Sequence, residues 1–320
     1  MGFIRPFTPD DIPLVSDLYA RSFHREGKSE TNVLETYLYQ IYFANPWYDA
    51  SFPSLVYQDD RTHISGFLGV MPRRMTLHGQ PIRAVIGSQL MVEPGNRTSM
   101  AGLYLVETFF AGPQDLSLID GATDAYRKIH EAIGGITALL YSFDWSQTVQ
   151  PLRAVPPLAA EALSETMLLA CLSDYAPDYV LRPEYDAHSL RWLLQLVAQG
   201  QHNGALQQIV LRDAARHVVG WYLYGLHPGG VGEVLQVGAV KSAMGEVLEH
   251  LFYHAGKHGA TSLRGRIDPM LRPVLSEKKC QFHRGHWMLA YAKSPELLRA
   301  IQDGKALLTR LDGEWCLRAP

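Results

Sequence analysis

Apolar residues recur along this chain with two spacings, every three to four residues or every second residue, which predict helices and strands respectively. The first part of the chain predicts a strand, two helices and three strands, and then helix, strand, helix and strand. In chain order these segments are residues 3–7, 8–23, 32–43, 54–58, 64–77, 81–92, 102–112, 115–122, 123–135 and 136–145. Three successive strands before a helix are not typical of a doubly wound parallel fold. The pattern therefore predicts an α/β domain (α+β) whose mixed, mostly antiparallel sheet is flanked by helices.

A similar order of apolar segments returns in the second half of the chain. In chain order these segments are a helix at 189–200, strands at 206–213, 217–226 and 233–240, a helix at 244–259, a strand at 261–267 and helices at 268–280 and 294–304. ISGFLGV at 64–70 and VVGWYLY at 218–224 stand at equivalent places, and Pro156-Pro157 interrupts regular structure between the halves. We interpret the chain as a tandem, diverged duplication with domains at 1–150 and 151–320.

The composition narrows the class of protein. The chain has 320 residues, of which 47% are hydrophobic and 19% charged, and its net charge is −3, as in soluble globular proteins. It has no basic run of the kind that nucleic-acid binding needs and no apolar span long enough for a membrane. Three widely separated cysteines form neither a metal quartet nor a disulfide framework, so we expect a cytoplasmic protein.

Three segments of the first half resemble the GNAT acetyltransferase superfamily. IRPFTPDDIPLVSDLYARSF at 4–23 is similar to its first strand and helix, and VEPGNRTSMAGLYL at 92–105 resembles its coenzyme A loop. DGATDAYRKIHEAIGG at 120–135 resembles a later helical segment. The resemblance extends over about residues 3–145 and is weaker over 188–292. It implies two tandem domains of this family, of which the second is degenerate.

The resemblance also implies where acetyl-coenzyme A, the acyl donor, binds. Arg97 takes the leading Arg of the loop motif and Gly102 its final Gly, whereas Met100 departs from the middle Gly. The implied contacts are Leu90, Met91, Val92, Arg97, Thr98, Ser99, Met100, Ala101, Gly102 and Thr123. Backbone N–H groups at a helix N-terminus bind pyrophosphate, and small side chains let it approach. An ordinary capped helix is the other interpretation of this loop.

Acyl transfer to an amine also needs groups that move protons. His130 stands where the family often has Tyr, and Tyr126 lies one turn earlier on the same helix face, so we expect one of them to protonate the leaving thiolate. The strand before the loop carries no carboxylate, and we expect Glu93, just past its end, to be exposed. The sequence thus shows no direct general base.

His250, His254 and His258 recur every four residues on one predicted helix. This spacing is compatible with zinc, but no HExxH pattern or carboxylate accompanies it, so we expect a solvated helix face and no metal site. Val247, Leu248 and Leu251 are expected to form the core side of that helix.

These features predict a coenzyme A-dependent N-acyltransferase that acts on a small-molecule or peptide amine. Two alternatives stay open, a non-catalytic coenzyme A-binding protein and a scaffold that binds a protein partner. We expect coenzyme A to bind only the first half, because the equivalent turn of the second half, Lys241 to Met244, lacks the Arg and the Gly positions.

Overall fold

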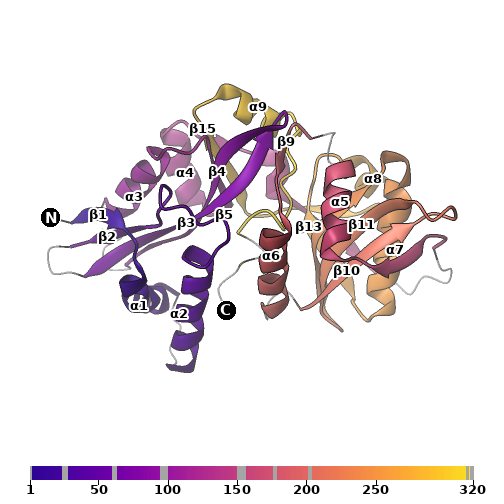
Figure 1. Cartoon of the computed structure of the whole chain (residues 1–320), viewed down its shortest axis with the longest axis horizontal. Helices are drawn as coiled ribbons and strands as arrows, with labels where there is room; N and C mark the ends of the chain where they lie inside the picture. The colour runs from indigo at the N-terminus through magenta and orange to yellow at the C-terminus, as the bar shows by residue number, and fades with distance from the viewer. Residues whose placement is uncertain are drawn as a thin grey trace.

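The computed structural model describes residues 2–23, 28–59, 63–93, 100–149, 156–175, 179–200, 204–314 and 317. Over these residues the chain forms two mixed sheets that lie side by side, each with helices on both faces (Figure 1). The predicted α/β fold with two mixed sheets is therefore confirmed. Among the described residues, no helix combines the length and apolar character that crossing a bilayer requires.

Sheet A belongs mainly to the first half of the chain. Its strands run in the order β1-β2-β3-β4-β5-β15-β6, and β9 pairs with the far end of β3. The strands are β1 (Phe3–Pro6), β2 (Leu55–Gln58), β3 (Ile64–Leu77), β4 (Gln80–Val92), β5 (Leu116–Ala122), β6 (Ile136–Thr137), β9 (Leu181–Pro183) and β15 (Trp287–Ala292). β3 and β4 form a hairpin closed by His78 (φ 51°) and Gly79 (φ 77°), as the HGQP turn predicts.

Sheet B belongs mainly to the second half. Its order is β14-β7-β13-β12-β11-β10-β8, in which β12 and β13 are parallel. The strands are β7 (Phe143–Thr148), β8 (Ala159–Ala162), β10 (Ala205–Arg212), β11 (Val218–Leu226), β12 (Val231–Ala239), β13 (Ser262–Arg266) and β14 (Gln281–Arg284).

Each sheet contains at least one strand from the other half of the sequence, and sheet A takes the short β9 at its edge in this way. β15 from the second half lies between β5 and β6 in sheet A, and β7 from the first half lies between β13 and β14 in sheet B. The sequence pattern predicted one strand over residues 136–145 as the end of the first domain. The structure instead divides this segment between β6 and β7, because a 3₁₀ turn at Leu139–Ser142 redirects the chain into the other sheet. The two halves are therefore joined by an exchange of strands.

Helices cover both faces of each sheet, and each sheet residue packs according to the face on which it lies. The helices are α1 (Ile12–Phe23), α2 (Lys28–Tyr42), α3 (Ala101–Phe110), α4 (Asp124–Ala132), α5 (Glu165–Tyr175), α6 (Ala187–Gln199), α7 (Met244–Lys257), α8 (Arg272–Glu277) and α9 (Pro295–Gln302). Alternation along β4 sends Ile86 to the core with α1 and α2, and Val85 to the core with α3 and α4. The α1–α2 core of sheet A continues into the α5–α6 core of sheet B.

Candidate active site

The centre of sheet A opens where β4 and β5 part. The two strands are paired in parallel from Ala84–Leu116 to Gly87–Ile119, and β4 then continues alone on that side to Val92. A bulge lies at the opening, because the β3 register shifts there and Gln89 adopts a left-handed conformation with φ 50°. The bulge turns the Gln89 N–H away from β3 and leaves it available to another acceptor.

The first turn of α3 follows the open end of β4. Its N-cap, Met100, has φ −74° and provides no side-chain cap, so its side chain, half exposed, does not occupy the turn. Ala101 is fully buried, and a Cβ on Gly102 would lie 3.3 Å from the Val92 side chain. Helix and strand end are thus closely packed, and the N-cap side chain of this ten-residue helix makes no capping hydrogen bond. These residues fit a pyrophosphate at the mouth of the opening.

The C-terminal segment brings a carboxylate into the same opening. Glu314 accepts a hydrogen bond from the Gln89 N–H at 3.2 Å, across 225 residues of sequence. Gly313 packs directly on Asp120 at the end of β5, where a Cβ would meet a carboxylate oxygen at 2.0 Å. Asp120 in turn pairs with Arg266 of sheet B, and both side chains are nearly buried. Glu314 is therefore held in the opening by contacts with both sheets.

Three hydroxyl groups, two from α2 and one from β4, lie at this opening. Tyr42 and Ser88 share a buried hydrogen bond of 2.8 Å, and the amide of Gln89 donates to the Tyr37 hydroxyl at 2.9 Å. Burial raises the pKa of Tyr42 strongly, the hydrogen bond with Ser88 partly offsets this rise, and the negative charge of Glu314 adds to it. The aromatic run of α2 thus contributes two hydroxyls to the opening, those of Tyr37 and Tyr42.

Tyr126 and His130 lie one turn apart on α4 but in different surroundings. Burial and the nearby negative charge of Glu314 raise the pKa of Tyr126. Its hydroxyl is buried and has no hydrogen-bond partner among the described residues. His130 is fully buried against Phe110 and the backbone of Gly135, and neither ring nitrogen has a described partner. Burial lowers the pKa of His130 to about 4, so the ring is neutral at neutral pH.

Solved structures with the same arrangement come from several organisms. A probable N-acyltransferase from Enterococcus faecalis has a TM-score of 0.65 at 11% identity, over 91% of this chain and 73% of its own. A GCN5-related N-acetyltransferase from Anabaena variabilis has a TM-score of 0.64 at 12% identity, over 90% and 72%. The sequence itself matches no family model and no curated protein. The chain has the fold of the GCN5-related N-acetyltransferases.

This fold also includes proteins that hold a longer acyl donor. A structure of N-myristoyltransferase from Saccharomyces cerevisiae, with bound myristoyl-CoA and inhibitors, has a TM-score of 0.54 at 10% identity and covers 92% of this chain and 83% of its own. The sequence resemblance of the first half to the acetyltransferase superfamily is thus confirmed at the level of the fold. The identities are too low to carry a substrate across.

Within the acetyltransferase fold, the described part of the predicted coenzyme site comes together. Leu90, Met91 and Val92 form the open end of β4, and Met100, Ala101 and Gly102 form the first turn of α3. Thr123 is the N-cap of α4, where its side chain accepts from the Tyr126 N–H at 3.3 Å. Arg97, Thr98 and Ser99 lie outside the described residues. The assignment of these residues to coenzyme A stays a prediction.

Glu93, expected to be exposed, lies at the surface with about a quarter of its side chain accessible. It pairs there with His63 at 3.0 Å and Arg21 at 3.4 Å. Its carboxylate is thereby engaged outside the opening.

The histidine face of α7, expected to be solvated, is exposed only at His258. His250 is buried and bonds to the Tyr222 hydroxyl at 3.0 Å, and His254 bonds to Tyr224 at 2.8 Å. Burial lowers the pKa of both rings, that of His254 to about 4. Within the described ranges no cluster of His, Cys, Asp or Glu is placed to hold a metal ion.

Sequence reasoning missed Glu314. Its segment, RLDGEW, reads as a tight turn, and the structure does contain that turn, since Asp312 caps Thr309 through a hydrogen bond of 2.9 Å to its N–H. No local pattern links a residue near the end of the chain to a bulge in β4, because the contact depends on the path of the whole C-terminal segment.

Proposed function

We propose that the chain is an acyl-CoA-dependent N-acyltransferase whose active site lies at the opening of sheet A, with acetyl-coenzyme A as donor and an amine as acceptor. The observation that carries the proposal is the meeting, at the β4 bulge, of Glu314 with the Gln89 N–H beside Tyr126. A carboxylate and a protonated phenol on one opening are the two proton-transfer groups that acyl transfer to an amine needs.

The residues of this chain divide the chemistry as follows. Glu314 takes the proton from the attacking amine as the new C–N bond forms. Tyr126, whose raised pKa keeps it protonated, donates to the thiolate sulfur as the C–S bond breaks. The first turn of α3 holds the pyrophosphate and so fixes the thioester at the bulge. Because its ring is neutral and buried, His130 serves the packing of α4 and not the proton transfer.

A catalytic carboxylate at this place favours an enzyme over a passive coenzyme A-binding protein. The sequence offered no base, which was the main reason to consider binding without turnover. Glu314 supplies a base from the end of the chain and its approach to the Gln89 N–H supports a role at the thioester. We therefore assign coenzyme binding to the first half, and assign the second half the task of holding the segment that carries the base.

The test compares equivalent positions of the two halves. Gly102 is the second residue of α3, and Gly245 is the second residue of α7. Gly102→Asp places a carboxylate and extra bulk at the proposed pyrophosphate site, whereas Gly245→Asp makes the same change in the second half, where a Cβ meets its nearest atom at 3.9 Å. Titration calorimetry with acetyl-coenzyme A reports both affinity and stoichiometry.

We expect one acetyl-coenzyme A per chain, with binding lost in Gly102→Asp and unchanged in Gly245→Asp. At a hundred times its dissociation constant the ligand adds about 2.7 kcal/mol to the stability of the wild-type protein, which a melting curve detects. Release of free thiol with a panel of primary amines then tests turnover. Two equal sites, or loss of binding only in Gly245→Asp, would contradict the assignment to the first half.

A further inference from the structure

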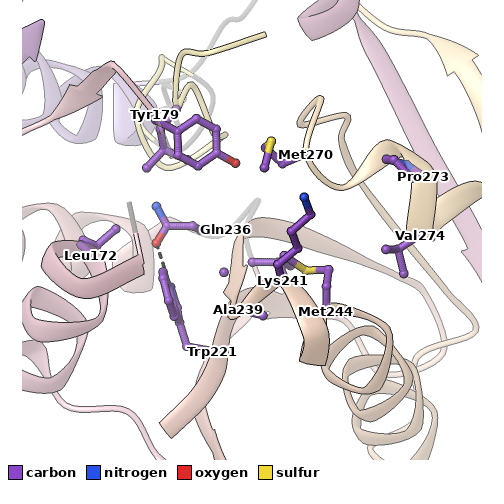
Figure 2. Close-up of a pocket in the computed structure, with 13 residues that line it drawn as sticks. Leu172, Tyr179, Trp221, Gln236, Ala239, Lys241, Met244, Met270, Pro273 and Val274 are labelled. Carbon is purple, nitrogen blue, oxygen red and sulfur yellow. Dashed lines mark hydrogen bonds between the residues drawn. The ribbon is translucent and has the colours of Figure 1, made fainter. Parts of the chain in front are cut away.

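Sheet B contains a cavity at the place that corresponds to the coenzyme site of sheet A. It lies beside the end of β12 and the start of α7, which are the second-half counterparts of β4 and α3. α5, the loop before α8 and Leu307 of the C-terminal segment close its sides. Its volume is about 210 Å³, and Figure 2 shows the side chains around it.

The lining is apolar apart from a few polar groups at one end. The described residues that line it are Leu172, Tyr179, Trp221, Gln236, Val237, Gly238, Ala239, Lys241, Met244, Met270, Pro273, Val274 and Leu307. Of these, Lys241 is the one charged side chain. Figure 2 shows its ammonium group directed into the space between Tyr179, Met270 and Val274.

The remaining polar groups of the wall already have partners. Trp221 donates to Gln236 at 3.1 Å, and Tyr179 donates to the buried carboxylate of Asp268 at 2.8 Å. These contacts leave the Lys241 ammonium as the group that defines the charge of a ligand. An anionic ligand with an apolar body matches this wall, and a cationic one does not.

The cavity is too short for coenzyme A. β12 and β13 part after Val234–Gly265, as β4 and β5 part in sheet A, but here the C-terminal segment enters the gap. Leu311 donates to the Leu235 carbonyl at 3.3 Å, and Thr309 contacts the amide of Gln236 at 3.4 Å. The slot that a pantetheine arm would take is therefore filled, and the remaining volume is below the roughly 300–1,000 Å³ of sites for drug-sized ligands.

We propose that this cavity binds a small carboxylic acid with an apolar chain, whose carboxylate pairs with Lys241 and whose chain lies against Trp221, Met270 and Leu307. The site does not depend on the acyl transfer proposed for sheet A. The apolar chain gains by leaving water, and the single charge at the open end fixes its orientation.

The first experiment measures the charge preference of the cavity. Octanoate and octan-1-ol are titrated calorimetrically into the full-length protein, and into Lys241→Gln and the matched control Lys257→Gln at the other end of α7. We expect octanoate to bind the wild type and Lys257→Gln equally, and Lys241→Gln about fivefold more weakly. Octan-1-ol should bind all three proteins alike. Equal octanoate affinity in the two variants, or no binding of octanoate, would overturn the proposal.

A second variant locates the ligand without changing charge. Ala239→Leu extends a side chain from the wall into the cavity and should abolish octanoate binding, while its melting temperature and acetyl-coenzyme A affinity show that the protein is folded. Saturation of the protein with acetyl-coenzyme A should leave octanoate binding intact. Displacement of octanoate by acetyl-coenzyme A would identify the cavity as a coenzyme site and would refute the proposal, as would unchanged affinity in Ala239→Leu.

Discussion

Sheets A and B open at equivalent places, and the two openings differ in what fills them. In sheet A, β4 leaves β5 after Gly87, and one side chain of the C-terminal segment, Glu314, reaches the bulge. In sheet B, β12 leaves β13 after Val234, and the backbone of the same segment occupies the gap at Leu311. The C-terminal segment therefore fills the opening of sheet B with its backbone and places a carboxylate in the opening of sheet A.

We infer from this difference that the second half contributes the position of the C-terminal segment and not a coenzyme site of its own. Figure 1 shows the C-terminal segment, in yellow, passing between the two halves. Its anchor is Arg310, almost fully buried, which pairs with Glu233 of β12 and with Asp144 of β7 at 2.9 Å. The second half thus fixes the direction in which the chain runs from Arg310 to Glu314. The exchange of β7 and β15 also joins the two sheets to each other.

The largest effect is expected from the side chain that distinguishes the two openings. Glu314→Gln keeps the shape of the residue but removes the base, so kcat should fall by roughly a hundredfold or more while acetyl-coenzyme A affinity is retained. The loss should shrink as the pH rises, because hydroxide increasingly replaces Glu314 in removing the proton that the nitrogen loses as the C–N bond forms. Glu296→Gln on α9, an exposed carboxylate that pairs with His78 at 3.3 Å, serves as the control for loss of a carboxylate outside the opening. A pH-independent loss would point to a structural role for Glu314.

The anchor in sheet B should contribute mainly to stability. Arg310→Met leaves the carboxylates of Glu233 and Asp144 without their shared buried partner, which typically costs about 3 kcal/mol. Urea denaturation measures the free energy of unfolding. Turnover of the folded variant should also fall, because Glu314 follows four residues later in the chain.

Arg83→Met is the matched control for this anchor, since the Arg83–Asp115 pair of 3.1 Å is largely exposed. It should change stability much less than Arg310→Met. If the two variants lose equal stability, the C-terminal segment is not anchored through Arg310.

The sequence predicted the longer strands of both sheets because their apolar periods are strong, but it did not predict β8, β9, β14 or β15. ISGFLGV and VVGWYLY became central strands, and Val247, Leu248 and Leu251 are buried as expected. The coenzyme loop was proposed from its local order of residues and stays a prediction. The strand exchange and Glu314 were not predictable in this way, because both depend on contacts between segments far apart in the chain. The histidine face of α7 was misjudged for the same reason, since two tyrosines of β11 cover it.

Substitutions of Tyr126 and His130 test the proposed division of α4 into a catalytic face and a packing face. Tyr126→Phe should lower kcat by about tenfold, less than Glu314→Gln, because a thiolate leaves with less help than an amine needs to lose its proton. His130→Phe should leave kcat near the wild-type value, because the neutral ring has no contact with Glu314 among the described residues. A large loss in His130→Phe with an unchanged Tyr126→Phe would return the role of proton donor to His130.

The smallest effect concerns acid stability and tests the burial of His130 directly. Burial lowers its pKa from 6.5 to about 4, so between these values the unfolded chain takes up a proton that the folded chain does not. Stability is therefore present in full above pH 6.5 and is lost as the pH falls toward 4. From pH 7 to 5 this residue should cost on the order of 2 kcal/mol, at about 1.4 kcal/mol per tenfold change in proton concentration.

Urea denaturation of wild type and His130→Phe at both pH values isolates this contribution, since the other histidines are common to the two proteins. The difference in stability between pH 7 and 5 should be smaller in His130→Phe, which has no imidazole at this position to take up a proton in the unfolded state. Equal pH dependence in the two proteins would mean that His130 is protonated in the folded chain. Its ring would then have access to protons, and the division of α4 into a catalytic and a packing face would fail.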